Sequence, residues 1–151
     1  MSGLTDDDVD ALIRLEKHAD NEDKYKFPEF REAICIDLLS DDKREKFVLD
    51  INRKGHIVLN KITYQIRARV IYPLLRLDIE GAPHTNPDGV KIGLPHLHIY
   101  KDGYGDTWAY DPVEIFGEKY KNSNKWLDIL NVFMEHCNIT VKPEFEENLF
   151  I

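Results

Sequence analysis

The most regular hydrophobic pattern in the chain lies in residues 62–70, where apolar and polar side chains alternate. This period of two predicts an antiparallel strand with one buried face and one polar face. Residues 31–39, 47–51, 75–79, 96–100 and 107–110 have apolar or alternating runs that are also typical of strands. The apolar face of the first strand would present Ile62, Tyr64, Ile66, Ala68 and Val70. Pro73 would interrupt the chain before the strand at 75–79.

Turn sequences separate these runs. Residues 52–55 end in Gly55, 86–89 read Asn-Pro-Asp-Gly, and 102–106 contain two glycines. Each is typical of a tight connection between neighbouring strands. We therefore expect a meander of five to six antiparallel strands.

Two amphipathic helices flank the predicted strands. Thr5 precedes three aspartates, a pattern typical of a helix start, and apolar residues at helical spacing continue to about Asp20. Asn122 or Ser123 would cap a second helix. Its apolar stripe contains Trp126, Ile129, Leu130, Phe133 and Cys137. The fold class is α+β, with both helices on one face of the sheet and a single domain over residues 1–151.

Composition favours a cytoplasmic protein. There is no apolar run near the roughly 18 residues that a membrane helix needs, and the acidic N-terminus does not resemble a signal peptide. Cys35 and Cys137 are too few for a disulfide framework, and both are expected in the core.

Charge is unevenly distributed along the chain. The net charge is −8, yet residues 51–110 have a net charge of +3. The overall charge argues against non-specific binding to nucleic acid, whereas the basic middle segment allows a local anion site.

Candidate chemistry is concentrated on the polar face of the predicted sheet. Alternation places His96, His98 and Tyr100 opposite Leu97 and Ile99. Arginine binds phosphate or carboxylate oxygens, and histidine titrates near neutral pH, so the set suits anion binding or acid–base catalysis. The proposed catalytic residues are His96, His98, Arg67, Arg69 and Tyr100, and the substrate-binding residues are Arg76, His84, Tyr104 and Trp108.

A purely structural role for the same residues is the main alternative. The arginines would then pair with Asp50, Asp78 or Glu80 on a solvated face, and the histidines would be partly buried and hydrogen-bonded. A second alternative is a divalent metal ion bound by His96 and His98 together with His84 and either Asp102 or Asp106, although no cofactor is required by the leading hypothesis.

Known phosphate-chemistry motifs do not match the chain. Histidine-triad hydrolases need a third histidine where Tyr100 stands, and two-histidine phosphoesterases need two His-x-Thr/Ser copies. Phosphate-binding loops and the nucleophile elbow of serine hydrolases are also missing from the sequence.

Residues 65–151 nevertheless resemble a family of small uncharacterised bacterial proteins. The resemblance rests on the segments 76–89 and 95–109, which include Pro-His-Leu-His-Ile-Tyr and Gly-Tyr-Gly-Asp, and on Phe133-Met-Glu-His-Cys-Asn138. Such proteins are often encoded in mobile or phage-derived neighbourhoods. The resemblance therefore implies a toxin-like or counter-defence role and assigns no catalytic residue.

Three hypotheses follow from the sequence. The leading one is a site that binds a phosphate-bearing ligand such as RNA and cleaves it with histidine and arginine, while Tyr100, Tyr104 and Trp108 stack on bases. The second is a non-enzymatic acidic module that binds a protein partner, either an antitoxin or an inhibited target. The third is a metal-dependent hydrolase.

Overall fold

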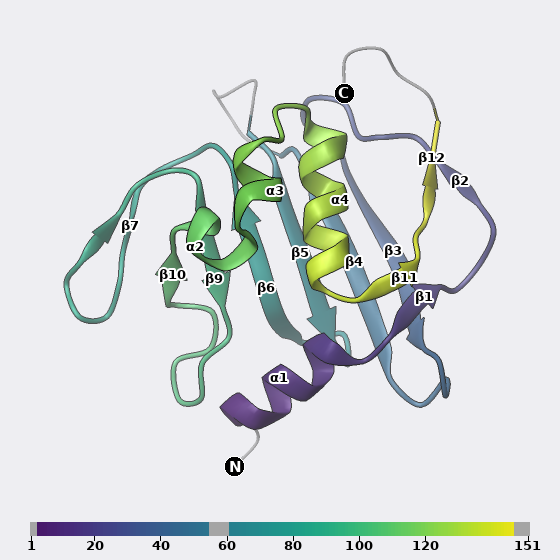
Figure 1. The fold of residues 1–151 in the computed structure, drawn as a ribbon, viewed down its shortest axis with the longest axis horizontal. Coiled ribbons are helices and arrows are strands. Elements are labelled where there is room, and N and C mark those ends of the chain that lie inside the picture. The colour runs from purple at the N-terminus through teal and green to yellow at the C-terminus, as the bar shows by residue number, and fades with distance from the viewer. Residues whose placement is uncertain (1–2, 55–60, 147–151) are drawn as a thin grey trace.

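One eight-stranded sheet forms the centre of the protein in the computed structural model, which describes residues 3–54 and 61–146 (Figure 1). The strand order is β10-β9-β6-β5-β4-β3-β1-β11. All neighbours are antiparallel except β1 and β11, which are parallel. The bounds are β1 Lys17–Ala19, β3 Ala33–Ser40, β4 Lys46–Asn52, β5 Thr63–Ala68, β6 Tyr72–Asp78, β9 His96–Ile99, β10 Ala109–Tyr110 and β11 Ile139–Val141.

The α+β class and the mainly antiparallel sheet are confirmed, but the expected five to six strands are too few. The two missed strands, β1 and β11, have three residues each, which is too short to show a periodic pattern. Two small sheets lie outside the main one. They pair β2 (Lys24–Tyr25) with β12 (Glu144–Phe145), and β7 (His84–Thr85) with β8 (Lys91–Ile92).

Four helices are present among the described residues: α1 (Asp6–Arg14), α2 (Pro112–Phe116), α3 (Glu118–Lys121) and α4 (Trp126–His136). Thr5 and Asp8 form the capping box that the sequence suggests for α1. Figure 1 shows α4 in front of the middle strands, whereas α1 lies near the end of the sheet where β5 ends. None of the described helices is long and apolar enough to span a bilayer.

The helix-covered face of the sheet is the apolar one. Tyr64 is fully buried, its ring packs on Phe133 of α4, and its hydroxyl donates a 2.7 Å hydrogen bond to the carbonyl of Trp126. Val9 and Leu12 of α1 join the same core. Burial of these side chains leaves the opposite face of the sheet to polar residues.

The predicted strand at 62–70 needs correction mainly at its C-terminal end, because β5 ends at Ala68. Arg69 and Val70 have positive φ values of 52° and 68°, so they form the turn between β5 and β6, and Val70 is 57% exposed. Two consecutive positive φ values are typical of the hairpin turns that match strand twist. Pro73 does not interrupt the strand but lies within β6 opposite Arg67, where the register shifts.

Helix boundaries also differ from those predicted. The first helix ends at Arg14, well before Asp20, because β1 begins at Lys17. The second does not start at Asn122 or Ser123. Asn122 instead ends α3, and Lys125 precedes α4 without a side-chain cap.

The two cysteines differ in environment. Cys137 is fully buried, as predicted, but Cys35 is exposed because it lies on the polar face opposite Asp50. The turns at 86–89 and 102–106 are confirmed by the positive φ values of Gly89, Gly103 and Gly105. Gly55 of the predicted first turn lies outside the described residues.

Candidate functional site

Strand register lines up polar side chains across the uncovered face of the sheet. One row contains Cys35, Asp50, Gln65, Arg76 and His98, each opposite the next on its neighbouring strand. The adjacent row contains Asn52, Thr63, Asp78 and His96. The histidines therefore lie at one end of both rows, on β9.

Asp78 lies between the two histidines. Its Oδ2 atom is 3.1 Å from Nε2 of His96 and 3.4 Å from Nε2 of His98. His96 and His98 are only 3% and 2% exposed. One ligand atom from each of the three residues lies within 4.8 Å of the other two, which is close enough for a single metal ion.

The Nδ1 atoms of His96 and His98 each lie within hydrogen-bond distance of a main-chain carbonyl oxygen. Nδ1 of His96 lies 3.2 Å from the carbonyl oxygen of Gly93, and Nδ1 of His98 lies 2.7 Å from that of Asp106. A carbonyl oxygen can only accept, so each Nδ1 donates its proton there. In a neutral imidazole the Nε2 lone pair then points toward Asp78, which is also an acceptor.

This arrangement places acceptors on both sides of two buried rings. Nε2 of His98 has no aligned hydrogen-bond partner, although the Asp78 carboxylate is near. The conflict disappears if each imidazole takes a second proton or if a cation lies between the three side chains.

Charge and burial act in opposite directions on this cluster. Burial lowers the pKa of His96, while the Asp78 carboxylate partly offsets that effect. Burial alone would raise the pKa of Asp78, but the adjacent His98 imidazole and the charge of Arg76 outweigh it and hold the pKa well below its ordinary value. Asp78 is therefore an anion at neutral pH, and His96 is mainly neutral.

A third imidazole comes from the hairpin of β7 and β8. The ring of His84 lies 4.7 Å from that of His98 and 5.9 Å from that of His96. Its Nε2 donates a 2.6 Å hydrogen bond to the carbonyl of Thr107, which leaves Nδ1 as the acceptor. His84 is half-buried.

Asn86 attaches this hairpin to β10. Its side-chain amide donates to the carbonyl of Ala109 at 2.9 Å, and its amide oxygen accepts from Ala109 N–H at 2.8 Å. One side chain thus continues the hydrogen bonding of the sheet edge and holds the hairpin beside the histidines.

The three arginines of the predicted site, Arg67, Arg69 and Arg76, pair with different carboxylates and do not form one cluster. Arg67 makes two hydrogen bonds, 2.6 and 2.9 Å, to the carboxylate of Asp50. Arg69 lies in the β5–β6 turn, where it pairs with Glu45, and it does not join the histidines.

Arg76 alone belongs to the histidine cluster. It contacts the carboxylates of Asp78 and Asp106 at 3.2 and 2.8 Å. Asp106, expected as a metal ligand, therefore has its carboxylate on Arg76, while its main chain holds His98.

The three aromatic residues of the predicted site also do not form one group: Tyr104 and Trp108 pack together, whereas Tyr100 packs elsewhere. Tyr100 packs edge-on against Tyr72, and its hydroxyl accepts from Leu4 N–H, so it lies away from the histidines. Tyr104 and Trp108 pack against each other with ring centroids 5.8 Å apart, and Tyr104 is 48% exposed.

Two neighbouring hollows open on the polar face. One, of about 300 Å³, is lined by Lys54, Lys61, Arg76 and Asp78 among others. The other, of about 380 Å³, is lined by Cys35, Asp50, Gln65 and Arg67 among others. Asn52, Thr63 and Arg76 line both, so the two hollows are contiguous.

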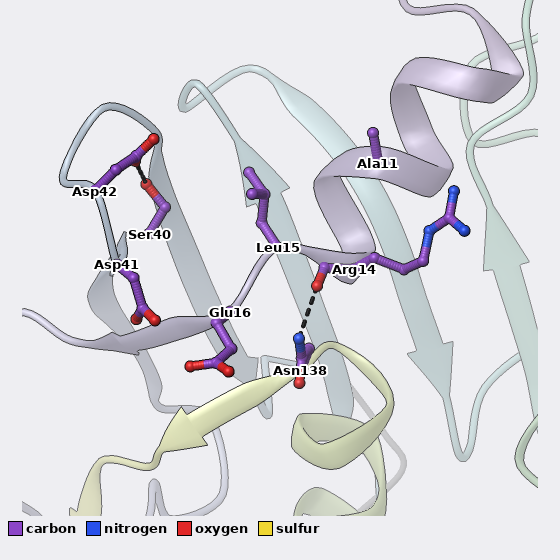
Figure 2. Close-up of a pocket in the computed structure, with 8 residues that line it drawn as sticks. All are labelled: Ala11, Arg14, Leu15, Glu16, Ser40, Asp41, Asp42 and Asn138. Carbon is purple, nitrogen blue, oxygen red and sulfur yellow. Dashed lines mark hydrogen bonds between the residues drawn. The ribbon is translucent and has the colours of Figure 1, made fainter.

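A separate cavity of about 590 Å³ lies between α1, the β3 end and the α4–β11 connection (Figure 2). Glu16, Asp41 and Asp42 line it, and the nearby carboxyl of Asp41 raises the pKa of Glu16. None of the predicted site residues is among its lining residues, and its acidity disfavours an anionic ligand.

Sequence reasoning missed three features of the site. It treated Asp78 only as a partner for arginine, and it assigned no role to Asn86 or to Lys54 and Lys61. The alternation of Arg76, Asp78 and Glu80 was visible, but only the pairing of β6 with β9 brings Asp78 between the histidines.

Comparisons with known proteins give a family but no activity. No curated protein matches the chain, and no solved structure matches it. Residues 4–139 match a family of unknown function, DUF6978, and this range includes every residue of the histidine cluster. Because the match extends over most of the sequence, the chain belongs to this family of unknown function.

Proposed function

We propose that this protein is a metal-dependent hydrolase of phosphate esters, with one divalent ion bound by Asp78, His96 and His98. The observation that supports this most directly is the excess of acceptors around the two buried imidazoles. Both Nδ1 atoms face carbonyl oxygens, and both Nε2 atoms face the same carboxylate oxygen. A cation between them would satisfy all three side chains.

The distances suit zinc. With metal–ligand bonds of about 2.0–2.1 Å, neighbouring ligand atoms of a tetrahedral site are roughly 3.3 Å apart. The two measured separations from Asp78 Oδ2 are 3.1 and 3.4 Å. Carbonyl acceptors behind metal-binding histidines are also the usual second layer of such sites, because they fix the tautomer.

Three protein ligands leave a position for water. A bound Zn²⁺ lowers the pKa of its water to about 7, which supplies a nucleophile at neutral pH. With the ion bound by Asp78, His96 and His98, Nδ1 of His84 would take the proton of the attacking water as its oxygen bonds to phosphorus and the P–O bond to the leaving group breaks. The leaving oxygen then takes a proton from solvent.

Two lysines near Asp78 support an anionic substrate. Lys54 and Lys61 line the hollow that reaches Asp78, and neither forms an ion pair with a described residue. Arg76 lines it too but is paired with Asp78 and Asp106, and Glu80 adds one carboxylate, so the lysines supply the unpaired positive charge. Metal-free cleavage by arginine is less well supported, because Arg67, Arg69 and Arg76 are all paired with carboxylates.

Metal binding is tested by titrating chelator-treated protein with Zn²⁺ in a calorimeter. We expect one ion per chain, and for His98→Gln an affinity at least about a hundredfold lower, since even second-layer changes cost 10- to 100-fold. His18→Gln is the matched control, because His18 also faces a carboxylate, Asp41, at 3.4 Å. Equal binding by wild type and His98→Gln would contradict the site.

Hydrolysis is tested with bis(p-nitrophenyl) phosphate and with single-stranded RNA, with and without chelator. We expect turnover that requires Zn²⁺ and is lost in His98→Gln but kept in His18→Gln. Turnover that survives the chelator would instead support a metal-free histidine mechanism. Zinc binding without turnover would assign the ion a structural role.

A further inference from the structure

The two hollows on the polar face differ in the charge of the side chains that line them. The hollow beside Asp78 has the cationic groups of Lys54, Lys61 and Arg76 and the carboxylates of Asp78 and Glu80, and its two lysines have no ion pair with a described residue. In the neighbouring hollow the charge of Arg67 is neutralised by Asp50 through two short hydrogen bonds. Apart from the shared Arg76, the rest of its polar lining is uncharged and comes from Asn52, Thr63 and Gln65, of which the Gln65 amide also donates to Asp50 and the Thr63 hydroxyl to Asp78.

Each hollow is large enough for part of a small ligand. The volumes are about 300 and 380 Å³, at the lower end of the range of about 300–1,000 Å³ for ligand pockets. The shared residues Asn52, Thr63 and Arg76 make one continuous surface from Asp78 to Cys35, across four strands. With strands about 4.8 Å apart, that surface is roughly 14 Å long.

We infer that this surface binds a nucleotide, with its phosphate beside Lys54, Lys61 and Arg76 and its nucleoside in the hollow of Cys35, Asn52 and Gln65. The inference rests on the proposed function for its orientation, because the phosphate would lie next to the metal. Amide and hydroxyl groups recognise the edges of bases and the hydroxyls of sugars, whereas the cations bind phosphate. The substrate class is then a nucleotide phosphodiester of a single strand.

Cys35 gives a variant that blocks only the nucleoside hollow. It is exposed on β3, whereas Asp78 and the histidines lie on β6 and β9. Cys35→Phe would fill the hollow without touching the proposed metal ligands. Asp37→Phe is the matched control, because Asp37 is exposed on the same strand and face but is not a lining residue of the hollow.

The first measurement is fluorescence anisotropy of a fluorescein-labelled deoxythymidine pentanucleotide, with protein both chelator-treated and loaded with Zn²⁺. We expect saturable binding that is at least tenfold weaker in Cys35→Phe and unchanged in Asp37→Phe. Thymidine monophosphate should displace the probe at least tenfold better than thymidine or inorganic phosphate, because only the nucleotide occupies both hollows. Absence of saturable binding, or equal loss in both variants, would overturn the inference.

A kinetic measurement separates this inference from the proposed function. If Zn²⁺-loaded protein hydrolyses bis(p-nitrophenyl) phosphate but Cys35→Phe leaves the KM for a thymidine dinucleotide unchanged, the nucleoside site is wrong and the hydrolase stands. If the pentanucleotide binds as expected but no ester is hydrolysed, the nucleotide site stands and the proposed reaction is wrong.

Discussion

The ammonium group of Lys17 donates a 2.7 Å hydrogen bond to the main-chain carbonyl of Cys137, a residue 120 positions later in the chain. Two further carbonyls, of Ile13 and Leu15, accept from the same ammonium at 2.8 Å, and the side chain is fully buried. Ile13 and Leu15 lie at the C-terminal end of α1, and Cys137 follows α4. One positive charge therefore satisfies the carbonyl ends of both helices.

Replacing Lys17 should destabilise the protein strongly. Lys17→Met preserves the length of the side chain but leaves one buried and two partly buried carbonyls without their donor, and each buried group left unpaired costs about 1–3 kcal/mol. We expect the free energy of unfolding to fall by about 3 kcal/mol or more, measured by urea denaturation. Lys24→Met on exposed β2 is the control and should change stability by less than about 0.5 kcal/mol. Similar small effects for both variants would contradict the capping role.

Local patterns were sufficient to predict the elements that have regular periodicity. Alternation of Leu97 and Ile99 with histidine correctly placed His96 and His98 opposite the core, because side-chain direction in a strand depends only on neighbours. The same reasoning failed at Arg69, since nothing in Arg69-Val70 signals positive φ as Gly or Asn would.

Long-range pairing explains the parts that could not be predicted. Asp78 faces both histidines only because β6 pairs with β9, and Asn86 reaches Ala109 only because its hairpin folds back on β10. The bidentate pair of Arg67 and Asp50 likewise depends on the β4–β5 register. Such contacts depend on strand order, which alternation within one strand does not specify.

The histidine cluster should make stability depend on pH in metal-free protein. Burial lowers the pKa of His96 below its ordinary value of 6.5, and burial does the same for His136 on α4. The unfolded chain then binds more protons than the folded one as pH falls through 6.5, so stability decreases on acidification, with a slope of at most about 1.4 kcal/mol per pH unit for each proton.

We expect urea midpoints measured between pH 7.5 and 5 in chelator to show this decrease. His96→Gln should reduce the slope without removing it, because His136 still contributes. An unchanged slope in His96→Gln would show that this imidazole titrates as it does in the unfolded chain. The lowered pKa of Asp78 adds a further loss of stability only below its ordinary value of 3.8.

The Asn86 contact can be tested separately from the metal. Asn86→Ala leaves the buried N–H and carbonyl of Ala109 without partners, so we expect a loss of about 2 kcal/mol or more. Hydrogen exchange of the Ala109 amide should quicken in the same variant, because its acceptor is gone. Val90→Ala, on an exposed residue of the same hairpin, should do neither.

Variants of Arg67 test whether this arginine has a structural or a catalytic role. Its guanidinium donates to both carboxylate oxygens of Asp50, and this hydrogen bonding holds the pKa of Asp50 below its usual value although burial opposes it. Arg67→Met leaves a half-buried carboxylate unpaired, and we expect a loss of about 2 kcal/mol in urea denaturation. Asp50→Asn combined with Arg67→Met should recover part of that loss, because no uncompensated charge remains.

Zinc affinity should stay within twofold of wild type in both variants, since neither residue contacts Asp78, His96 or His98. A large loss of zinc binding or of Zn²⁺-dependent turnover in Arg67→Met, with stability unchanged, would instead assign Arg67 to the catalytic site.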